Sequence, residues 1–319
     1  MRPEAGESSQ PLRCAVVGVG HMGRLHAGKY AAAPEWNLVA VVDIDRAAAE
    51  RAAAATNVRA LADYRALLGE VDAVSIAVPT PIHHQVASDF LNAGAHVLVE
   101  KPITQTLEEA DDLIQLAGRM DRTLQVGHIE RFNGALMALD LEHAEPRFIE
   151  AVRIAPFNPR GSDVSVVLDL MIHDIDLVLD MVDSELARVD AHGSPVLSDG
   201  IDIANARLEF VNGCVANITA SRVSQKVERK MRLFLRDSYA SIDFHQRKLS
   251  RHRIGRPAEP GGVPEVVSET TSFTSLDALE TQLRHFALCI RSRKEPPTSG
   301  RAARRALALA DQIGHLLER

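Results

Sequence analysis

Two separate stretches of the chain place a basic side chain beside a carboxylate, an arrangement suited to general acid–base chemistry. Glu100 and Lys101 stand together directly after the apolar residues 97–99. Asp169 and His173 are four residues apart in a stretch that is otherwise mostly apolar. A carboxylate one helical turn away can orient an imidazole and raise its basicity, so this pair could take a hydroxyl proton near neutral pH.

Each arrangement also has a purely structural interpretation. Lys101 could be a surface lysine at a strand end, and His173 could be a satisfied histidine in an interface. Asp176 and Asp180 extend the face of the helix expected over residues 164–182, so this polar stripe should meet a cavity or a partner. The zinc-helix pattern, two histidines four residues apart with a glutamate, is absent, so no metal site is expected. Pro102 stiffens the turn after Lys101 and could be cis.

A glycine-rich segment near the N-terminus has the spacing of a dinucleotide-binding turn. Residues 18–23 read Gly-Val-Gly-His-Met-Gly and match G-x-G-x-x-G between the first expected strand and the first expected helix. The first glycine allows a tight turn, the second lets the backbone approach a pyrophosphate, and the third allows close helix–strand packing. The alternative is a glycine-rich turn without a ligand. The predicted cofactor-binding residues here are Gly18, Gly20, His21, Met22 and Gly23.

A carboxylate at the end of the second expected strand bears on the choice of dinucleotide. Asp43 follows Gly23 by about 20 residues, the spacing of the ribose-binding acid in this type of site. Such a carboxylate accepts hydrogen bonds from the adenosine ribose and repels a 2′-phosphate, which favours NAD over NADP. Arg46 could instead help to hold a 2′-phosphate, or it could be a solvated residue of a first helical turn.

The first part of the chain alternates strands and helices, and this alternation must position these residues. The pattern predicts βαβ units and a doubly wound parallel sheet, an α/β fold. The glycine turn and the Glu100–Lys101 pair then fall at the carboxyl ends of strands, where such sheets bind ligands. The expected strands are residues 12–17, 38–42, 73–78, 95–99 and 124–127, and the expected helices are residues 21–33, 46–56, 82–93 and 107–119.

After about residue 128 the pattern changes to consecutive strands, which predicts an α+β domain with an open, mainly antiparallel sheet. The expected domains are a flexible tail (1–11), a Rossmann domain (12–128) and an α+β domain (129–319), whose last helix (301–319) could pack back on the Rossmann domain. The expected strands are residues 149–155, 187–192, 204–211, 214–223, 231–235 and 240–245; helices are expected at 164–182, 277–291 and 301–317, and a loop at 256–268.

Composition and charge exclude several classes of protein. The 319 residues include 36 Lys and Arg against 43 Asp and Glu, a net charge of −7, which argues against general nucleic-acid binding. The three cysteines form no C-x-x-C pair, which argues against a disulfide framework and fits a reducing cytoplasm. Residues 164–182 carry too many charges for a membrane span, and the first 11 residues lack the apolar core of a signal peptide. We therefore expect a soluble, cytoplasmic protein.

Taken together, these motifs resemble the glucose–fructose oxidoreductase / inositol dehydrogenase / MocA family over nearly the whole chain. Residues 18–23 with His26 resemble its opening motif, and residues 79–83 (Pro-Thr-Pro-Ile-His) resemble its third-strand motif. Glu100-Lys101-Pro102 resembles its most diagnostic signature, and residues 169–173 match its D-x-x-x-H helix. The resemblance implies a Rossmann domain joined to an α/β domain whose open sheet mediates oligomerisation, as a homodimer or homotetramer.

The resemblance also implies roles for individual residues. The residues it places where a sugar hydroxyl meets the nicotinamide are Lys101, Asp169 and His173. The residues it places along the cofactor are Thr80, His83 and Glu100. The spacer after Thr80 is shorter than in the family, so either His83 or His84 is the equivalent histidine.

A narrower resemblance concerns the substrate. Residues 127–133 (Gly-His-Ile-Glu-Arg-Phe-Asn) and 165–176 are similar to a bacterial branch that includes UDP-N-acetylglucosamine 3-dehydrogenases. This implies a 3-keto nucleotide sugar, which a downstream aminotransferase converts for lipid A or surface polysaccharide. Planar guanidinium groups suit phosphate, so the candidates for contacting a diphosphate are Arg131, Arg153 and Arg160. An ordinary salt bridge is the alternative for each.

Three functions remain open on the sequence. The first is an NAD-dependent dehydrogenase of UDP-N-acetylglucosamine, in which His173, oriented by Asp169, accepts the hydroxyl proton and Lys101 holds the oxygen, or the reverse. The second is the same chemistry on a free sugar or inositol. The third is a catalytically silent NAD-binding regulator, which would be expected to lack the lysine or the histidine; both are present.

Overall fold

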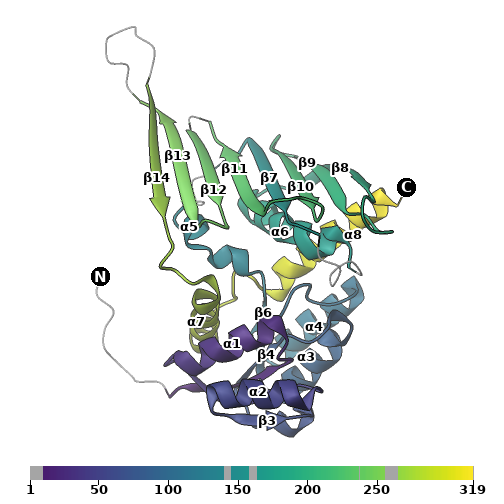
Figure 1. The fold of residues 1–319 in the computed structure, drawn as a ribbon, viewed down its shortest axis with the longest axis vertical. Helices are drawn as coiled ribbons and strands as arrows, with labels where there is room; N and C mark the ends of the chain where they lie inside the picture. The colour runs from purple at the N-terminus through teal and green to yellow at the C-terminus, as the bar shows by residue number, and fades with distance from the viewer. Residues whose placement is uncertain (1–9, 140–144, 158–163, 237, 256–264, 319) are drawn as a thin grey trace. The chain divides into compact units, whose positions relative to one another are not determined.

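The computed structural model describes residues 10–139, 145–157, 164–236, 238–255 and 265–318. Most of the expected N-terminal tail therefore lies outside the described residues. The chain divides into two compact units, one formed by Met1–Gly127 with Leu279–Arg301 and the other by His128–Ala278 with Ala302–Arg319. Each unit has its own sheet (Figure 1).

The first unit contains a six-stranded parallel sheet in the order β3-β2-β1-β4-β5-β6. The strand order reverses between β1 and β4, whose last residues Val17 and Ile76 are paired. Dinucleotides bind at this switch point in such sheets, and the predicted doubly wound α/β fold is confirmed. The strands are β1 (Leu12–Val17), β2 (Trp36–Val42), β3 (Arg59–Leu61), β4 (Ala73–Ile76), β5 (His96–Val99) and β6 (Leu124–Val126).

Local signals set the helix ends in this unit. Asp45 caps α2 by accepting from the backbone N–H groups of Ala47 and Ala48, and Thr106 with Glu109 forms a capping box at the start of α4. In the packing, α1 lies against α2, and α3 against α4 (Figure 1). The helices are α1 (His21–Ala32), α2 (Arg46–Thr56), α3 (His83–Asn92), α4 (Leu107–Arg119) and α7 (Ala278–Ser292), with 3₁₀ turns η1 (Tyr64–Leu67) and η2 (Thr80–Ile82).

The helix α7 belongs with the first unit, although it follows the second unit's sheet in the chain. The Phe286 ring stacks on Trp36 at a centroid distance of 5.7 Å, and the Gln282 amide donates to the Val126 carbonyl oxygen at 3.4 Å. The division thus differs from the expected one, which assigned everything after residue 128 to the second domain. These contacts explain the difference, because they bury one face of α7 against the N-terminal sheet.

The second unit contains an eight-stranded sheet in the order β14-β13-β12-β11-β7-β10-β9-β8. Among the described residues of this sheet, only β7 and β10 pair in parallel, so the predicted mainly antiparallel sheet is confirmed. The strands are β7 (Phe148–Ile154), β8 (Leu186–Ser194), β9 (Ile203–Phe210), β10 (Val215–Ser221), β11 (Glu228–Phe234), β12 (Ser238–Asp243), β13 (Lys248–Ile254) and β14 (Val266–Ser272).

One face of this sheet supplies the second core. Buried and less buried residues alternate along β7, β9 and β10, as expected for a sheet covered on one side. The helices α6 (Ile172–Met181) and α8 (Gly300–Leu317) contribute apolar side chains to the same cluster, among them Ile175 and Ile313. The segment Ala302–Arg319 is grouped with this unit, whereas the sequence had left open that it packs on the Rossmann domain.

Three local features differ from the sequence-based expectation. The stretch expected as one helix over residues 164–182 contains a π-helical segment, η5 (Val167–Met171), ahead of α6. The strands β3 and β13 were not expected, because Arg59–Leu61 is short and Lys248–Ile254 is rich in charged residues. The loop expected over residues 256–268 is wrong from Val266 onward, where the fully exposed strand β14 begins; residues 256–264 lie outside the described part.

Among the residues that the structure describes, no helix has both the length and the apolar character that a membrane crossing requires.

Candidate functional site

The glycine turn after β1 has the steric features of a dinucleotide cradle. Gly18 adopts φ +85°, and a Cβ atom there would lie 2.6 Å from the Ala77 carbonyl oxygen. A Cβ atom on Gly23 would lie 1.8 Å from the Gly18 carbonyl oxygen, so close packing of α1 on the turn requires glycine. At Gly20, by contrast, no heavy atom of the described residues outside the turn lies within 4 Å of the position that a Cβ atom would take. The turn is therefore closed toward the protein at two glycines and open at the third.

The start of α1 presents backbone donors to this open side. Gly20 precedes α1 and provides no side-chain cap, and the first helical bond returned to it comes from the Arg24 N–H group at 3.3 Å. The N–H groups of His21, Met22 and Gly23 precede that bond in the first turn, where helices lack intrahelical acceptors. Such a terminus favours a phosphate group.

Asp43 stands at the end of β2 beside this turn. One carboxylate oxygen accepts from the Val19 N–H group at 2.8 Å, and the other accepts from the Asp45 N–H group at 2.9 Å. Each oxygen keeps a further lone pair that can accept from a ribose hydroxyl. Arg46 is largely exposed and forms an i,i+4 ion pair with Glu50 at 2.8 Å. The glycine turn and this carboxylate together fit a nicotinamide dinucleotide.

The segment after β4 contains the next expected cofactor residues. Thr80 begins the short turn η2, and His83 follows it as the first residue of α3. The two ring nitrogens of His83 lie 2.9 Å from the Pro102 carbonyl oxygen and 2.8 Å from the Val78 carbonyl oxygen, so this buried ring links the ends of β4 and β5. His84, the alternative equivalent, instead contacts Asp112 at 2.8 Å.

Glu100 is held by a buried chain of polar side chains beneath the end of β5. His26 Nε2 lies 3.0 Å from Glu100 Oε1, and His26 Nδ1 lies 3.1 Å from Ser75 Oγ. Ser75 Oγ in turn lies 2.7 Å from the Tyr30 hydroxyl. A neutral His26 satisfies the chain when Tyr30 donates to Ser75, Ser75 donates to Nδ1, and Nε2–H donates to Glu100.

Gly127 leaves the space that the Glu100 carboxylate occupies. A Cβ atom on Gly127 would lie 2.7 Å from Glu100 Oε2. Lys101 follows Glu100 and is half-buried, and its peptide bond to Pro102 is cis, as the sequence left open. The glycine turn, Asp43, Glu100 and Lys101 thus all lie at the carboxyl edge of the first unit's sheet.

The other two expected catalytic residues belong to the second unit. Asp169 lies inside the π-helical segment η5, where the Ile172 N–H group bonds to the Val167 carbonyl oxygen five residues back, and His173 is the second residue of α6. Both side chains are half-buried. Single-turn π segments occur often at functional sites. This widened turn contains the aspartate of the D-x-x-x-H motif and ends just before the histidine.

The remaining carboxylates of the polar stripe contact Arg131. Its Nε and Nη2 atoms each lie 2.7 Å from an oxygen of Asp176, and its Nη1 pairs with Asp180. Burial alone would raise the pKa of Asp176, but His128 and Arg131 outweigh that effect and lower it. Asp176 is therefore a charged, internally neutralised group, and its partner is a protein side chain.

Arg153 lies in a second buried ion-pair cluster. Its Nε and Nη2 atoms lie 2.9 Å from the two oxygens of Asp174, and its Nη1 lies 2.8 Å from Glu130 Oε1. Burial disfavours its charge, but the two carboxylates outweigh that effect and raise its pKa. Arg131 and Arg153 thus form salt bridges with protein carboxylates, which is the alternative to diphosphate binding that the sequence left open for each. Arg160 lies outside the described residues.

Sequence reasoning did not single out several members of these clusters. Spacing along one chain does not reveal partners far apart in the sequence, and this applies to Tyr30 and Ser75 in the chain beneath Glu100. Gly127, Glu130 and Asp174 lie within the quoted motifs at 127–133 and 165–176, so their presence there was the available signal.

Comparisons with known proteins agree with this arrangement. Residues 12–128 match the model of an oxidoreductase family with an NAD-binding Rossmann fold, and residues 134–238 match the GFO/IDH/MocA C-terminal domain. A UDP-N-acetylglucosamine 3-dehydrogenase of Acidithiobacillus ferrooxidans is 42% identical over 95% of this chain and 96% of its own length. A scyllo-inositol 2-dehydrogenase (NAD(+)) of Bacillus subtilis is 27% identical over 89% of this chain and 88% of its own.

A solved structure extends the comparison to the fold. A structure of the Acidithiobacillus ferrooxidans UDP-N-acetylglucosamine 3-dehydrogenase superposes with a TM-score of 0.90, covering 96% of this chain and 97% of that one. The matched regions include the glycine turn, Asp43 and the Glu100–Lys101 pair in the first family model, and the η5–α6 segment in the second. The chain belongs to the GFO/IDH/MocA family and is an NAD(P)-dependent oxidoreductase.

Proposed function

We propose that this protein oxidises the 3-hydroxyl of UDP-N-acetylglucosamine to a ketone with NAD as the cofactor. The observation that supports this most strongly is the 42% identity to a UDP-N-acetylglucosamine 3-dehydrogenase along nearly the full length of both chains. Similarity over both domains includes the part of the chain that would recognise the substrate. A match confined to the Rossmann domain would support cofactor binding alone.

The proposed chemistry assigns one task to each of three side chains. Bound NAD supplies the acceptor for the hydride that leaves the sugar carbon. His173 accepts the proton of the sugar hydroxyl, and Asp169 orients the imidazole. The Lys101 ammonium holds the same oxygen and stabilises the negative charge that develops on it. The reverse assignment, with Lys101 as the base, uses the same atoms.

The cofactor would be held by the residues at the carboxyl edge of the first sheet. We propose that the backbone of residues 18–23 takes the pyrophosphate and that Asp43 takes the adenosine ribose, with Thr80, His83 and Glu100 along the nicotinamide half. Glu100 suits this role because His26 fixes its carboxylate at 3.0 Å. NAD is preferred over NADP because Asp43 is a carboxylate and Arg46 is engaged by Glu50.

The three arginines differ in how readily they could meet a diphosphate. Arg131 and Arg153 are each held by a two-pronged carboxylate contact, which supports a role in positioning α6 over direct phosphate binding. Arg160 is the remaining candidate for a phosphate contact. We further propose a cytoplasmic homodimer or homotetramer whose 3-keto product passes to an aminotransferase of lipid A or surface polysaccharide synthesis.

A second candidate substrate is an inositol or a free sugar. The 27% identity to a scyllo-inositol 2-dehydrogenase, again along most of both chains, favours it as the alternative. The chemistry would be unchanged, because Lys101, Asp169 and His173 act on a hydroxyl whatever carries it. Binding of UDP distinguishes the two, since an enzyme for free sugars should ignore the nucleotide.

The test is NADH absorbance after mixing the protein with NAD and UDP-N-acetylglucosamine, with a carbonyl trap present to draw the equilibrium. We expect a rise with the wild-type protein and a loss of about a hundredfold or more in rate for Lys101→Ala and for His173→Ala. Lys248→Ala and His192→Ala are the matched controls, because both side chains are exposed on the second unit's sheet, and they should retain the rate. A flat trace with NAD binding intact would reject the nucleotide sugar; turnover of scyllo-inositol would then support the alternative.

A further inference from the structure

The first unit has a cavity of about 400 Å³ at the edge of its sheet opposite the glycine turn. The lining includes His96, the first residue of β5, and Thr123 and Leu124 at the start of β6. All six strands are parallel, so the amino ends of β5 and β6 lie at the other edge from Gly18, Asp43 and Glu100. The dinucleotide-binding residues therefore do not account for this cavity.

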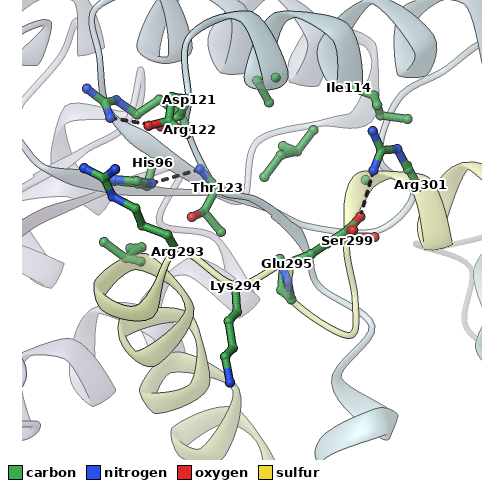
Figure 2. A pocket seen from close by; sticks show the side chains of 16 residues that line it. His96, Ile114, Asp121, Arg122, Thr123, Arg293, Lys294, Glu295, Ser299 and Arg301 are labelled. Carbon is green, nitrogen blue, oxygen red and sulfur yellow. Dashed lines mark hydrogen bonds and ion pairs between the residues drawn. The ribbon is translucent and has the colours of Figure 1, made fainter.

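Cationic side chains outnumber carboxylates around the cavity. Arg122, Arg293, Lys294 and Arg301 line it, against Asp121 and Glu295. Glu295 already pairs with Arg301 at 3.6 Å. Figure 2 shows the Arg122 and Arg293 side chains gathered beside His96, with Lys294 pointing away from them.

The two arginines beside His96 have unused donors. Arg122 Nη1 donates to the Asp121 carbonyl oxygen at 3.0 Å, while its Nε is buried without a hydrogen-bond partner in the described structure. Arg293 is exposed and has no ion-pair partner among the described residues. A guanidinium presents five N–H donors, and phosphate oxygens match its planar geometry.

His96 adds a neutral donor at the same end. Its Nδ1 accepts from the Thr123 backbone N–H group at 2.9 Å, so in the neutral ring the proton resides on Nε2. Burial, reinforced by the neighbouring Arg122, lowers the pKa of His96 to about 4, so the ring is neutral at physiological pH. His96 thus adds a hydrogen-bond donor without adding another positive charge.

The opposite wall is formed by the beginning of α8. Ser299, Gly300 and Arg301 line the cavity at the start of this 18-residue helix. The N–H groups of a first helical turn lack intrahelical acceptors. A helix start of this kind favours a negative charge. Ile114 and Leu124 also line the cavity, next to Gly300, and provide an apolar surface.

We propose that this cavity is a binding site for the phosphate group of a small metabolite, separate from the cofactor site. The Arg122 and Arg293 guanidinium groups and His96 Nε2–H would contact the phosphate, and the start of α8 would favour its charge from across the cavity. Phosphate is the better match than carboxylate because it offers three terminal oxygens to this number of donors. The cavity would bind phosphate whichever sugar the enzyme oxidises.

The experiment titrates inorganic phosphate into the full-length protein with NAD at saturation, so that the glycine turn is already occupied. Calorimetry measures the dissociation constant, and sodium chloride keeps the ionic strength constant. We expect one saturable site that weakens by about tenfold or more in Arg122→Gln/Arg293→Gln, since charge-assisted hydrogen bonds are lost. The matched control is Arg51→Gln/Arg119→Gln, which removes the same charge from exposed helical positions of the same unit that do not line the cavity.

Any of three results would overturn the proposal: unchanged phosphate affinity in Arg122→Gln/Arg293→Gln, equal weakening in the control pair, or equally tight binding of acetate. Arg293→Glu guards against a folding defect, because this side chain is exposed and its replacement should abolish binding while the melting temperature stays near that of the wild type. Anomalous density for tungstate between Arg122 and Arg293 in crystals soaked with that ion would support the site directly, and density confined to the glycine turn would contradict it.

Discussion

Arg131 donates two hydrogen bonds of 2.7 Å to the Asp176 carboxylate, and both side chains are almost fully buried. Arg131 comes from the 3₁₀ turn η3 (Ile129–Phe132), whereas Asp176 lies on α6, one turn after His173. Arg153 forms the equivalent bidentate ion pair with Asp174 of the same helix. The helix that carries the proposed base is thus held by buried ion pairs at two positions, Asp174 and Asp176.

The first prediction concerns the stability that the Arg131–Asp176 ion pair provides. Arg131→Gln should lower the free energy of unfolding by about 3–5 kcal/mol, because it leaves the Asp176 carboxylate buried without its guanidinium. Urea denaturation measures the change. Asp176→Asn in the Arg131→Gln background should cost much less than it does alone, since the charge it removes is already unpaired. Strictly additive losses would contradict the coupling. Arg188→Gln, in an exposed pair with Asp190, is the control and should cost at most about 1 kcal/mol.

The order of elements was predictable because hydrophobic periodicity is a local property. The expected helices at 107–119, 277–291 and 301–317 correspond to α4, α7 and α8 within one residue at each end. Periodicity failed where other forces decide the structure. The exposed edge strand β14 buries no apolar face, and the π turn η5 differs from an α-helix by a backbone register that side-chain pattern does not encode.

The residues of the candidate site also differ in whether they could be predicted from the sequence. Glycine spacing and the Glu100-Lys101-Pro102 motif could be read directly from the sequence, because each is a local arrangement. The partners of those residues could not be read, since Glu100 is 74 positions from His26, and Arg153 is 21 positions from Asp174. Whether an arginine meets a ligand or a buried carboxylate depends on the folded chain.

The second prediction tests the chain of hydrogen bonds beneath Glu100. His26→Ala should destabilise the protein by about 1–3 kcal/mol and weaken NAD binding, because it leaves Ser75 and Glu100 without their shared partner. Calorimetry with NAD and urea denaturation give the two values. Tyr30→Phe is the control: it removes only the terminal hydroxyl, so it should cost about 1 kcal/mol and leave NAD affinity unchanged. Equal effects of the two variants on NAD affinity would show that His26 does not act through Glu100.

The third prediction concerns the choice between NAD and NADP. Asp43→Asn removes the negative charge at the end of β2 while keeping one acceptor for the Val19 N–H group. We expect kcat/KM with NAD to fall by about tenfold, and the ratio of NADP to NAD use to rise because repulsion of a 2′-phosphate is relieved. Asp45→Asn, two residues on, preserves the cap of α2 and should leave the ratio unchanged. A ratio unaffected by Asp43→Asn would place cofactor discrimination elsewhere.

A further buried carboxylate shapes the second unit. Asp202 Oδ2 accepts from the backbone N–H groups of Val196, Leu197 and Ser198 at 2.6–2.8 Å. Its Oδ1 accepts from the Ser198 hydroxyl at 2.6 Å and from Arg222 Nε at 3.0 Å. Burial alone would raise the pKa of Asp202, but the hydrogen bonds from Val196, Leu197 and Ser198 outweigh it and hold the pKa well below its usual range.

The fourth prediction follows from the lowered pKa of Asp202. The folded state keeps Asp202 charged at pH values where the unfolded chain, with an ordinary pKa of about 3.9, binds a proton. The stabilisation is therefore fully present above about pH 5 and is lost as the pH falls through and below about 4. Urea denaturation at a series of pH values should show Asp202→Asn much less stable than the wild type near neutrality, with the gap narrowing toward about pH 2. The exposed Asp199→Asn is the control and should show no such narrowing. A gap of constant size across the series would mean that Asp202 contributes through shape and hydrogen bonding alone, independently of its charge.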